Sequence, residues 1–224
     1  MFVVNRRDPS LVPTLEITEM NNPRKVGVVL FDAFELLDVF GPLEMLGLLP
    51  DEFSLHLVAE TRGEVTSAQG PRSVVDAAFS DPERYDILLV PGGRGTRVEV
   101  ENPTLVGWLR DQARTASFVT SVCTGSALLA RSGVLDGRRA TTNKAAWKWV
   151  CSQSQAVEWV AQARWVEDGN LFTSSGVSAG VDMTLALIAR ILGEARAREV
   201  ARWTEYDWHD QADWDPFAAV HGLV

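Results

Sequence analysis

Short apolar runs alternate along the chain with stretches whose apolar residues recur at helical spacing. The runs predict β-strands at residues 25–31, 53–59, 85–90 and 117–122. Their near-continuous aliphatic character is typical of strands buried on both faces of a sheet. Helical spacing extends over residues 35–48, 102–114, 124–130, 178–192 and 194–206. This alternation predicts one α/β domain over residues 24–224, built on a mostly parallel sheet.

Residues that favour turns and helix ends refine this outline. Asn102 followed by Pro103 predicts a capped helix start, and Ser178 is a candidate cap for the helix after it. The pair Gly41-Pro42 interrupts the first helical pattern, so that helix is predicted to start or restart at Pro42. Asp168-Gly169 predicts a tight hairpin.

Two segments lack a sustained pattern. Residues 64–79 are rich in turn residues and predict a short hairpin. Residues 1–23 contain three prolines and no lasting periodicity. We therefore expect these first residues to form an extended arm that lies on the body of the protein or on a partner subunit.

Composition narrows the functional classes. Lys and Arg number 21 against 30 Asp and Glu, a net charge of −9, which disfavours binding to a phosphate backbone. The residues after Ile191 are neither long nor basic enough for a DNA-binding domain. No apolar run approaches the roughly 20 residues of a membrane helix, and charged residues interrupt any signal-peptide core near the N-terminus. With only two cysteines, we expect a cytoplasmic protein with free thiols.

Cys123 lies between a predicted buried strand and a helix that opens with Thr124-Gly125-Ser126. This order places the thiol above the carboxyl ends of the strands, where open α/β sheets bind ligands. It also directs the sulfur at the free N–H groups of a helix start, which lower the pKa of a cysteine. Small residues permit the sharp turn of a nucleophile elbow. A buried, inert cysteine fits the local pattern equally well.

Two other features carry candidate chemistry. Gly92-Gly93 follows the third predicted strand, and its exposed N–H groups could hold an anion or a developing negative charge. A plain tight turn is the alternative, and no Lys-Ser/Thr follows to indicate a phosphate loop. Asp38 lies in an apolar run, where burial would raise its pKa, keep it protonated and let it donate a hydrogen bond to a thiolate. The alternative for Asp38 is a helix cap.

In this order, the three features resemble the DJ-1/PfpI (ThiJ) superfamily, from about residue 25 to at least residue 192. Residues 119–126 (VTSVCTGS) and 135–142 (LDGRRATT) look like its isonitrile hydratase branch, and residues 38–42 and 175–182 agree with it. The resemblance implies a flavodoxin-like three-layer α/β sandwich and a homodimer. An apolar, aromatic pocket suits a small uncharged organic substrate, and we expect no cofactor and no metal.

The resemblance assigns the nucleophile to Cys123 and the acid to Asp38, and it matches Thr124 to the hydratase threonine. Gly93 matches a glycine that lines the anion pocket. The protease-like members carry a histidine directly after the nucleophile, whereas Thr124 cannot take a proton near neutral pH. Cys-His peptidase or glyoxalase chemistry is therefore disfavoured. Asn143 stands where many hydratase-like members have histidine and cannot shuttle protons, so the exact substrate stays open.

The resulting hypothesis is a lyase that hydrates an isonitrile to an N-substituted formamide. One alternative is a cysteine redox sensor of a stress response, with little or no catalysis. Another is a different glyoxalase or hydrolase activity of the superfamily. The C-terminal aromatic residues predict core, a subunit interface or the wall of a substrate pocket; they are Trp203, Tyr206, Trp208, Trp214 and Phe217.

Overall fold

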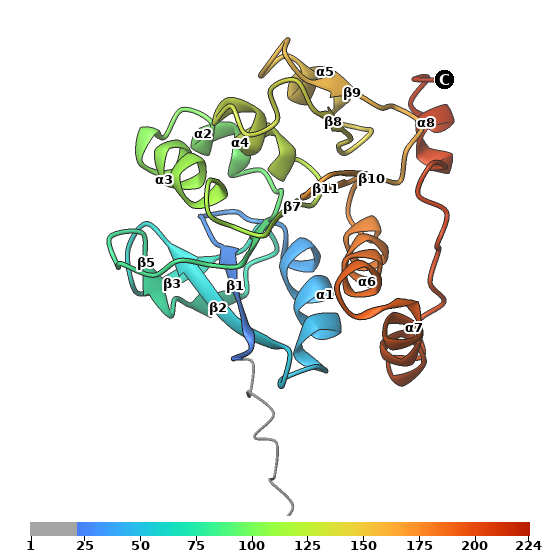
Figure 1. Cartoon of the computed structure of the whole chain (residues 1–224). Coiled ribbons are helices and arrows are strands. Elements are labelled where there is room, and N and C mark those ends of the chain that lie inside the picture. Colours follow the sequence, from blue (N-terminus) through green and yellow to red (C-terminus); the bar gives the residue numbers. More distant parts are fainter. Residues whose placement is uncertain (1–21) are drawn as a thin grey trace, which may run out of the picture.

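The computed structural model describes residues 22–224, in which a seven-stranded sheet separates two layers of helices (Figure 1). The strands of this sheet are β1 (Arg24–Val29), β2 (Phe53–Ala59), β5 (Ala77–Ala78), β6 (Ile87–Val90), β7 (Phe118–Ser121), β10 (Trp165–Asp168) and β11 (Leu171–Ser174). They follow the order β10-β11-β7-β6-β1-β2-β5, and every neighbouring pair is parallel except β10–β11. The prediction of an α/β sandwich with a mostly parallel sheet is confirmed.

Helices cover both faces of the sheet. On one face lie α1 (Leu36–Gly47) and α6 (Ala179–Leu192), with α7 (Glu194–Trp203) packed outside α6. On the other face lie α3 (Pro103–Ala113) and α4 (Gly125–Arg131) (Figure 1). The remaining elements are short: α2 (Thr96–Glu99), α5 (Trp147–Cys151), α8 (Pro216–Val220), β3 (Glu64–Thr66), β4 (Arg72–Val74), β8 (Arg139–Ala140) and β9 (Glu158–Trp159).

The core follows the central strands. Val28 of β1, Leu88 of β6, Val119 of β7 and Phe172 of β11 are fully buried. Their strands are covered by helices on both faces, which explains why they read as near-continuous apolar runs rather than as alternating ones. Leu128 of α4 is also fully buried and packs the opposite layer onto this sheet.

Most predicted element ends hold, and two are wrong. The side chain of Asn102 accepts hydrogen bonds from two amides of α3, as expected of a cap. Ser178 occupies the N-cap position of α6, but its side chain makes no capping hydrogen bond. Helix α1 does not restart at Pro42 but runs through it. Pro42 lacks the N–H that would bond to the carbonyl of Asp38, and the neighbouring Gly41 packs closely against Val181 of α6.

Two other expectations concern the chain's periphery. The predicted hairpin within residues 64–79 is formed by β3 and β4. The predicted extended arm lies outside the described residues, except for its last two positions. Between residues 22 and 224, no helix has both the length and the apolar character needed to cross a membrane.

We expect Leu128→Ala to lower the free energy of unfolding by about 2–5 kcal/mol, because it leaves a cavity in a fully buried layer. Val98→Ala is the control, since Val98 is 71% exposed and should change stability by less than about 0.5 kcal/mol. Urea denaturation of both variants measures the difference. Equal destabilisation of the two would contradict the packing described for α4.

Candidate active site

The carboxyl ends of four neighbouring parallel strands, β1, β6, β7 and β11, meet at one edge of the sheet. The segments that follow these strands carry Asp38 in α1, Gly92, Cys123 and Gly176. The sequence separates these residues by up to 138 positions, but the order of the strands brings them together. This edge is where open α/β sheets bind ligands.

Cys123 occupies a sharp left-handed turn between β7 and α4. Its φ is +56°, a value uncommon for residues other than glycine, which persists only where neighbours hold it. Its amide donates to the carbonyl of Ser175 at 3.2 Å. Its carbonyl accepts from the hydroxyls of Ser126 at 3.1 Å and Thr142 at 2.9 Å. The predicted elbow is therefore present, and three separate segments hold it in place.

Two glycines allow the elbow to pack so closely. A Cβ atom on Gly125 would lie 2.1 Å from the carbonyl oxygen of Val90, so only glycine lets α4 begin against β6. A Cβ atom on Gly176 would lie 2.1 Å from Nδ2 of Asn143 and 3.1 Å from Sγ of Cys123. Gly176 therefore forms one wall beside the thiol.

Asp38 is fully buried in the first turn of α1. Its Oδ2 accepts a hydrogen bond from the amide of Gly92 at 2.8 Å, and Oδ1 has no hydrogen-bond partner among the described residues. Burial raises the pKa of Asp38 well above its usual value, and the Gly92 amide and the Cys123 thiol lower it only in part. The predicted direction of this pKa shift is confirmed. Asp38 does not cap α1, because the cap position belongs to Glu35.

The expectation of a lowered pKa for Cys123 is wrong. The thiol is only 6% exposed, and burial together with the nearby Asp38 carboxylate raises its pKa well above the usual value. The amide of Thr124 and the side chain of Asn143 act in the opposite direction, as expected for a helix start, but they are outweighed. Burial thus favours a neutral thiol beside a neutral acid.

Asn143 and Thr124 both contact the elbow region. Asn143 donates a hydrogen bond towards the Cys123 thiol, and its Oδ1 accepts from the amide of Ala146 at 2.9 Å, which fixes the side chain. The hydroxyl of Thr124 accepts from the amide of Gly93 at 3.1 Å and from the hydroxyl of Thr96 at 3.1 Å. Thr124 thus connects the elbow to the glycine turn that follows β6.

These contacts correct the prediction that Gly92 and Gly93 hold an anion. The amide of Gly92 is used by Asp38, and the amide of Gly93 is used by Thr124. Neither N–H is left for a ligand in this arrangement. The glycine turn instead orients Asp38 and Thr124. A sequence pattern cannot distinguish a turn with this role from an anion pocket.

Sequence reasoning missed several residues that shape the site. Ser175 and Thr142 hold the two peptide groups of Cys123, and the charge of Glu35 raises the pKa of both Asp38 and Cys123. The motif at residues 175–182 includes Ser175, but a motif does not specify that its carbonyl accepts from the amide of Cys123. Nothing in the sequence marks Glu35, because its influence depends on spatial proximity to the pair.

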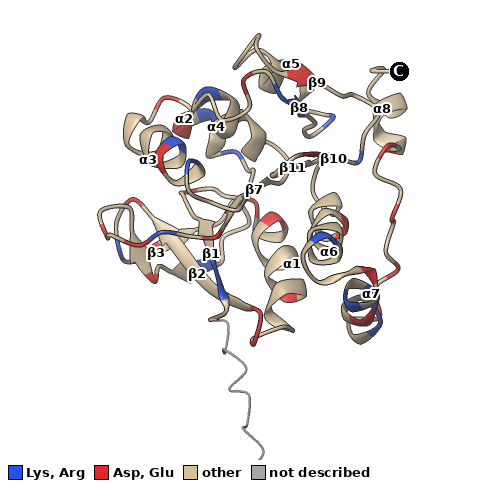
Figure 2. Ribbon diagram, in the orientation of Figure 1, with Lys and Arg blue, Asp and Glu red and all other residues tan. Residues whose placement is uncertain are grey.

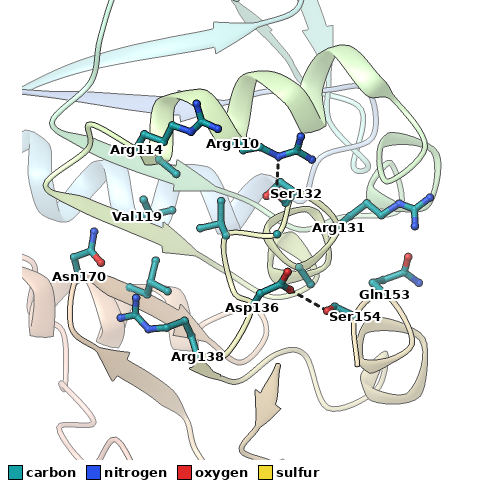
Figure 3. A pocket seen from close by; sticks show the side chains of 15 residues that line it. Arg110, Arg114, Val119, Arg131, Ser132, Asp136, Arg138, Gln153, Ser154 and Asn170 are labelled. Atoms are coloured by element: carbon teal, nitrogen blue, oxygen red, sulfur yellow. Dashed lines mark hydrogen bonds between the residues drawn. The ribbon is translucent and has the colours of Figure 1, made fainter. Parts of the chain in front are cut away.

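A cavity of about 700 Å³ lies at the opposite edge of the sheet, where β7 and β11 begin (Figure 3). Four arginines line it, and two of them form ion pairs at 3.1 Å: Arg131 with Glu101, and Arg138 with Asp168. None of the predicted site residues contributes to it.

Over the rest of the described chain, basic and acidic positions are interspersed (Figure 2). Within residues 22–224 no three His, Cys, Asp or Glu side chains are placed to share a metal ion.

The fold and the site define an α/β protein that carries a buried cysteine on a strained elbow beside a buried carboxyl group. The chain belongs to the DJ-1/PfpI family, whose family model matches residues 24–190.

Relatives of known name share most of the chain. Isonitrile hydratase of Pseudomonas putida is 37% identical over 182 residues, which cover 81% of this chain and 78% of that protein. The HTH-type transcriptional regulator GbdR of Pseudomonas aeruginosa is 31% identical over 193 residues, which cover 83% of this chain but 52% of the regulator. A THiJ/PfpI family protein from Pseudomonas syringae has a similar structure, with a TM-score of 0.76, 27% identity and coverage of 90% of this chain and 82% of that one.

We expect Asn143→Asp to slow alkylation of Cys123. The substitution keeps the acceptor for Ala146 but replaces a donor to sulfur by a carboxylate, so the pKa of the thiol rises and less thiolate is present at a given pH. The rate with iodoacetamide at a fixed, mildly alkaline pH should fall by about tenfold.

Intact mass spectrometry follows this reaction in a Cys151→Ser background. The control is Asn170→Asp, the same chemical change in the cavity at the opposite edge of the sheet. An unchanged or faster rate in Asn143→Asp would contradict the hydrogen bond from Asn143 to the thiol.

Proposed function

We propose that this protein hydrates isonitriles to N-substituted formamides, with Cys123 as nucleophile and Asp38 as acid. The observation that carries the proposal is the buried pair itself: a thiol on a strained turn faces a carboxyl group whose pKa is raised. The similarity to the Pseudomonas putida isonitrile hydratase supports the choice of reaction. The carboxyl group of Asp38 already holds the proton that the terminal carbon of an isonitrile must receive.

In the first step, the sulfur of Cys123 bonds to the terminal carbon of R–N≡C, and the same carbon accepts a proton from Asp38. The product is a thioimidate, R–N=CH–S–Cys123. The S–H bond breaks in the same step and its proton passes to the other oxygen of Asp38, so the carboxyl group stays neutral. Asn143 and the amide of Thr124 favour the thiolate during attack. General acid catalysis by a positioned carboxyl group contributes about 10²–10⁴-fold.

In the second step, water adds to the thioimidate carbon. One oxygen of Asp38 takes a proton from this water while the other gives its proton to the nitrogen, and the second proton of the added water passes to the sulfur as the intermediate collapses. The carbon–sulfur bond then breaks, which releases R–NH–CHO and restores the thiol. The net reaction converts R–NC and water to R–NH–CHO, and no oxidant, reductant or metal takes part.

The identity of the residue after the nucleophile supports addition rather than peptide hydrolysis. Thr124 cannot serve as a base, and its hydroxyl is bound to Gly93 and Thr96. Addition to an isonitrile needs a proton for carbon, which Asp38 can supply, and does not need a base that later protonates an amine. The homodimer and the cytoplasmic setting stay predictions.

Purified protein incubated with cyclohexyl isonitrile should form N-cyclohexylformamide, followed by NMR. Cys123→Ala should lose about 10³-fold or more of this activity, because the covalent route is removed. Asp38→Asn should lose about 10²–10⁴-fold. Cys151→Ala is the matched control and should keep full activity, because Cys151 lies on α5 outside the site.

Two results would contradict the proposal. Formamide production by Cys123→Ala at the wild-type rate would rule out the covalent mechanism. Absence of formamide from the wild-type protein, with Cys123 still available to alkylating agents, would exclude isonitrile hydration as the activity.

A further inference from the structure

A cavity of about 460 Å³ lies between the start of α6 and the C-terminal segment, defined here as residues 204–217. This segment returns from α7 to α8 past the ends of β10 and α6 (Figure 1). Aromatic and polar side chains both line it: Arg164, Ser178, Trp208, His209, Asp210, Gln211, Trp214, Pro216 and Phe217.

The cavity is bracketed by two segments that touch the thiol of Cys123. On one side, Ser178 lines the cavity two residues after Gly176. The Cα of Gly176 faces Sγ of Cys123 so closely that a Cβ would lie 3.1 Å away. Two residues of chain span at most about 7 Å. Ser178 at the rim of the cavity therefore lies no farther than this from Gly176, the glycine beside the sulfur.

On the other side, Asn143 interacts with the thiol, and its neighbour Lys144 is held beneath the C-terminal segment. The ammonium group of Lys144 lies 3.9 Å from the carboxylate of Asp215, and both side chains are almost fully buried. Asp215 in turn accepts a hydrogen bond from the amide of Phe217 at 3.0 Å. The aromatic wall is thus fixed to the residue that follows Asn143.

The charges of the cavity are already neutralised. Arg164 forms a buried ion pair with Asp182 at 2.5 Å, and Asp210, which also lines the cavity, pairs with Arg198 at 3.0 Å. Trp214 is 54% exposed and Phe217 is 49% exposed, although both are large apolar side chains. Exposed aromatic side chains around a concave site whose arginine and aspartate are both ion-paired favour an uncharged apolar ligand.

The wall also lies outside the part of the chain that the family model matches, which ends at residue 190. The elbow, the acid and Asn143 fall within the matched part, whereas the C-terminal segment does not. The chemistry therefore comes from the shared part of the chain, and the aromatic wall comes from residues beyond it.

We infer that the cavity between α6 and the C-terminal segment receives the hydrocarbon group of the substrate, with Trp214 and Phe217 as specificity-determining residues. The inference rests on the proposed function, since it names the part of an isonitrile that this surface binds. Bulky alkyl and aryl isonitriles are then the preferred substrates. Small ones such as methyl isonitrile lack the surface to fill the cavity.

The test compares cyclohexyl with methyl isonitrile in three variants. In Trp214→Ala and Phe217→Ala, the ratio of kcat/KM for cyclohexyl over methyl isonitrile should fall about tenfold, as expected when about 60 Å² of apolar contact is lost. Trp203→Ala is the matched control, because Trp203 is 77% exposed on α7 and does not line the cavity. An unchanged ratio in both cavity variants would overturn the inference.

A binding measurement separates this inference from the proposed function. N-cyclohexylformamide is titrated calorimetrically into Cys123→Ala and into the double variant Cys123→Ala/Trp214→Ala. Affinity about tenfold weaker in the double variant supports the cavity whether or not the wild type turns over isonitriles. Equal affinity of the two proteins, or no binding to either, overturns it. Failure of wild-type turnover alone counts against the reaction and not against the cavity.

Discussion

The left-handed turn at Cys123 is the constraint on which the rest of the site depends. Such a conformation costs a residue with a Cβ about 1–3 kcal/mol, so it persists only because its peptide groups are held from outside. Ser175 accepts its amide hydrogen bond, and the hydroxyls of Ser126 and Thr142 bind its carbonyl. These partners follow β11, begin α4 and follow β8. The position of the thiol is therefore a property of the assembled sheet, and not of the local sequence.

The packing that holds the turn also decides where the proton resides. Excluding water raises the pKa of Asp38 and of Cys123 together, and Glu35 adds to both effects. The chain has three histidines, and none of them is among the groups that shift the pKa of either member of this pair. A neutral acid beside a neutral thiol suits the proposed addition to a carbon that must become C–H. It suits acyl transfer less well, because there a base must later protonate a departing amine.

The sequence was sufficient for the parts of the molecule that follow from local pattern. Buried strands, the Asn102 cap and the strand–Cys123–helix order all depend on residues close together in the chain. The path of α1 through Pro42 was not predictable, because a proline within a helical pattern predicts a helix start or end, and only the folded chain shows that the helix continues. The same limit explains the amides of Gly92 and Gly93 and the pKa of Cys123, since their hydrogen-bond partners and burial exist only in the folded chain.

One fold supports both a hydratase and a regulator among the relatives, so the fold alone does not assign a function. Here the surroundings are tied to the elbow by a continuous set of contacts. The buried carboxylate of Asp182 binds Arg164 and the amide of His209. The carbonyl of Arg164 accepts from the amide of Ser175, whose own carbonyl accepts from the amide of Cys123. The C-terminal segment and the thiol are thus positioned by the same residues. Substitution of its exposed aromatic side chains can alter which ligand reaches the sulfur while these contacts, and with them the geometry of the elbow, stay intact.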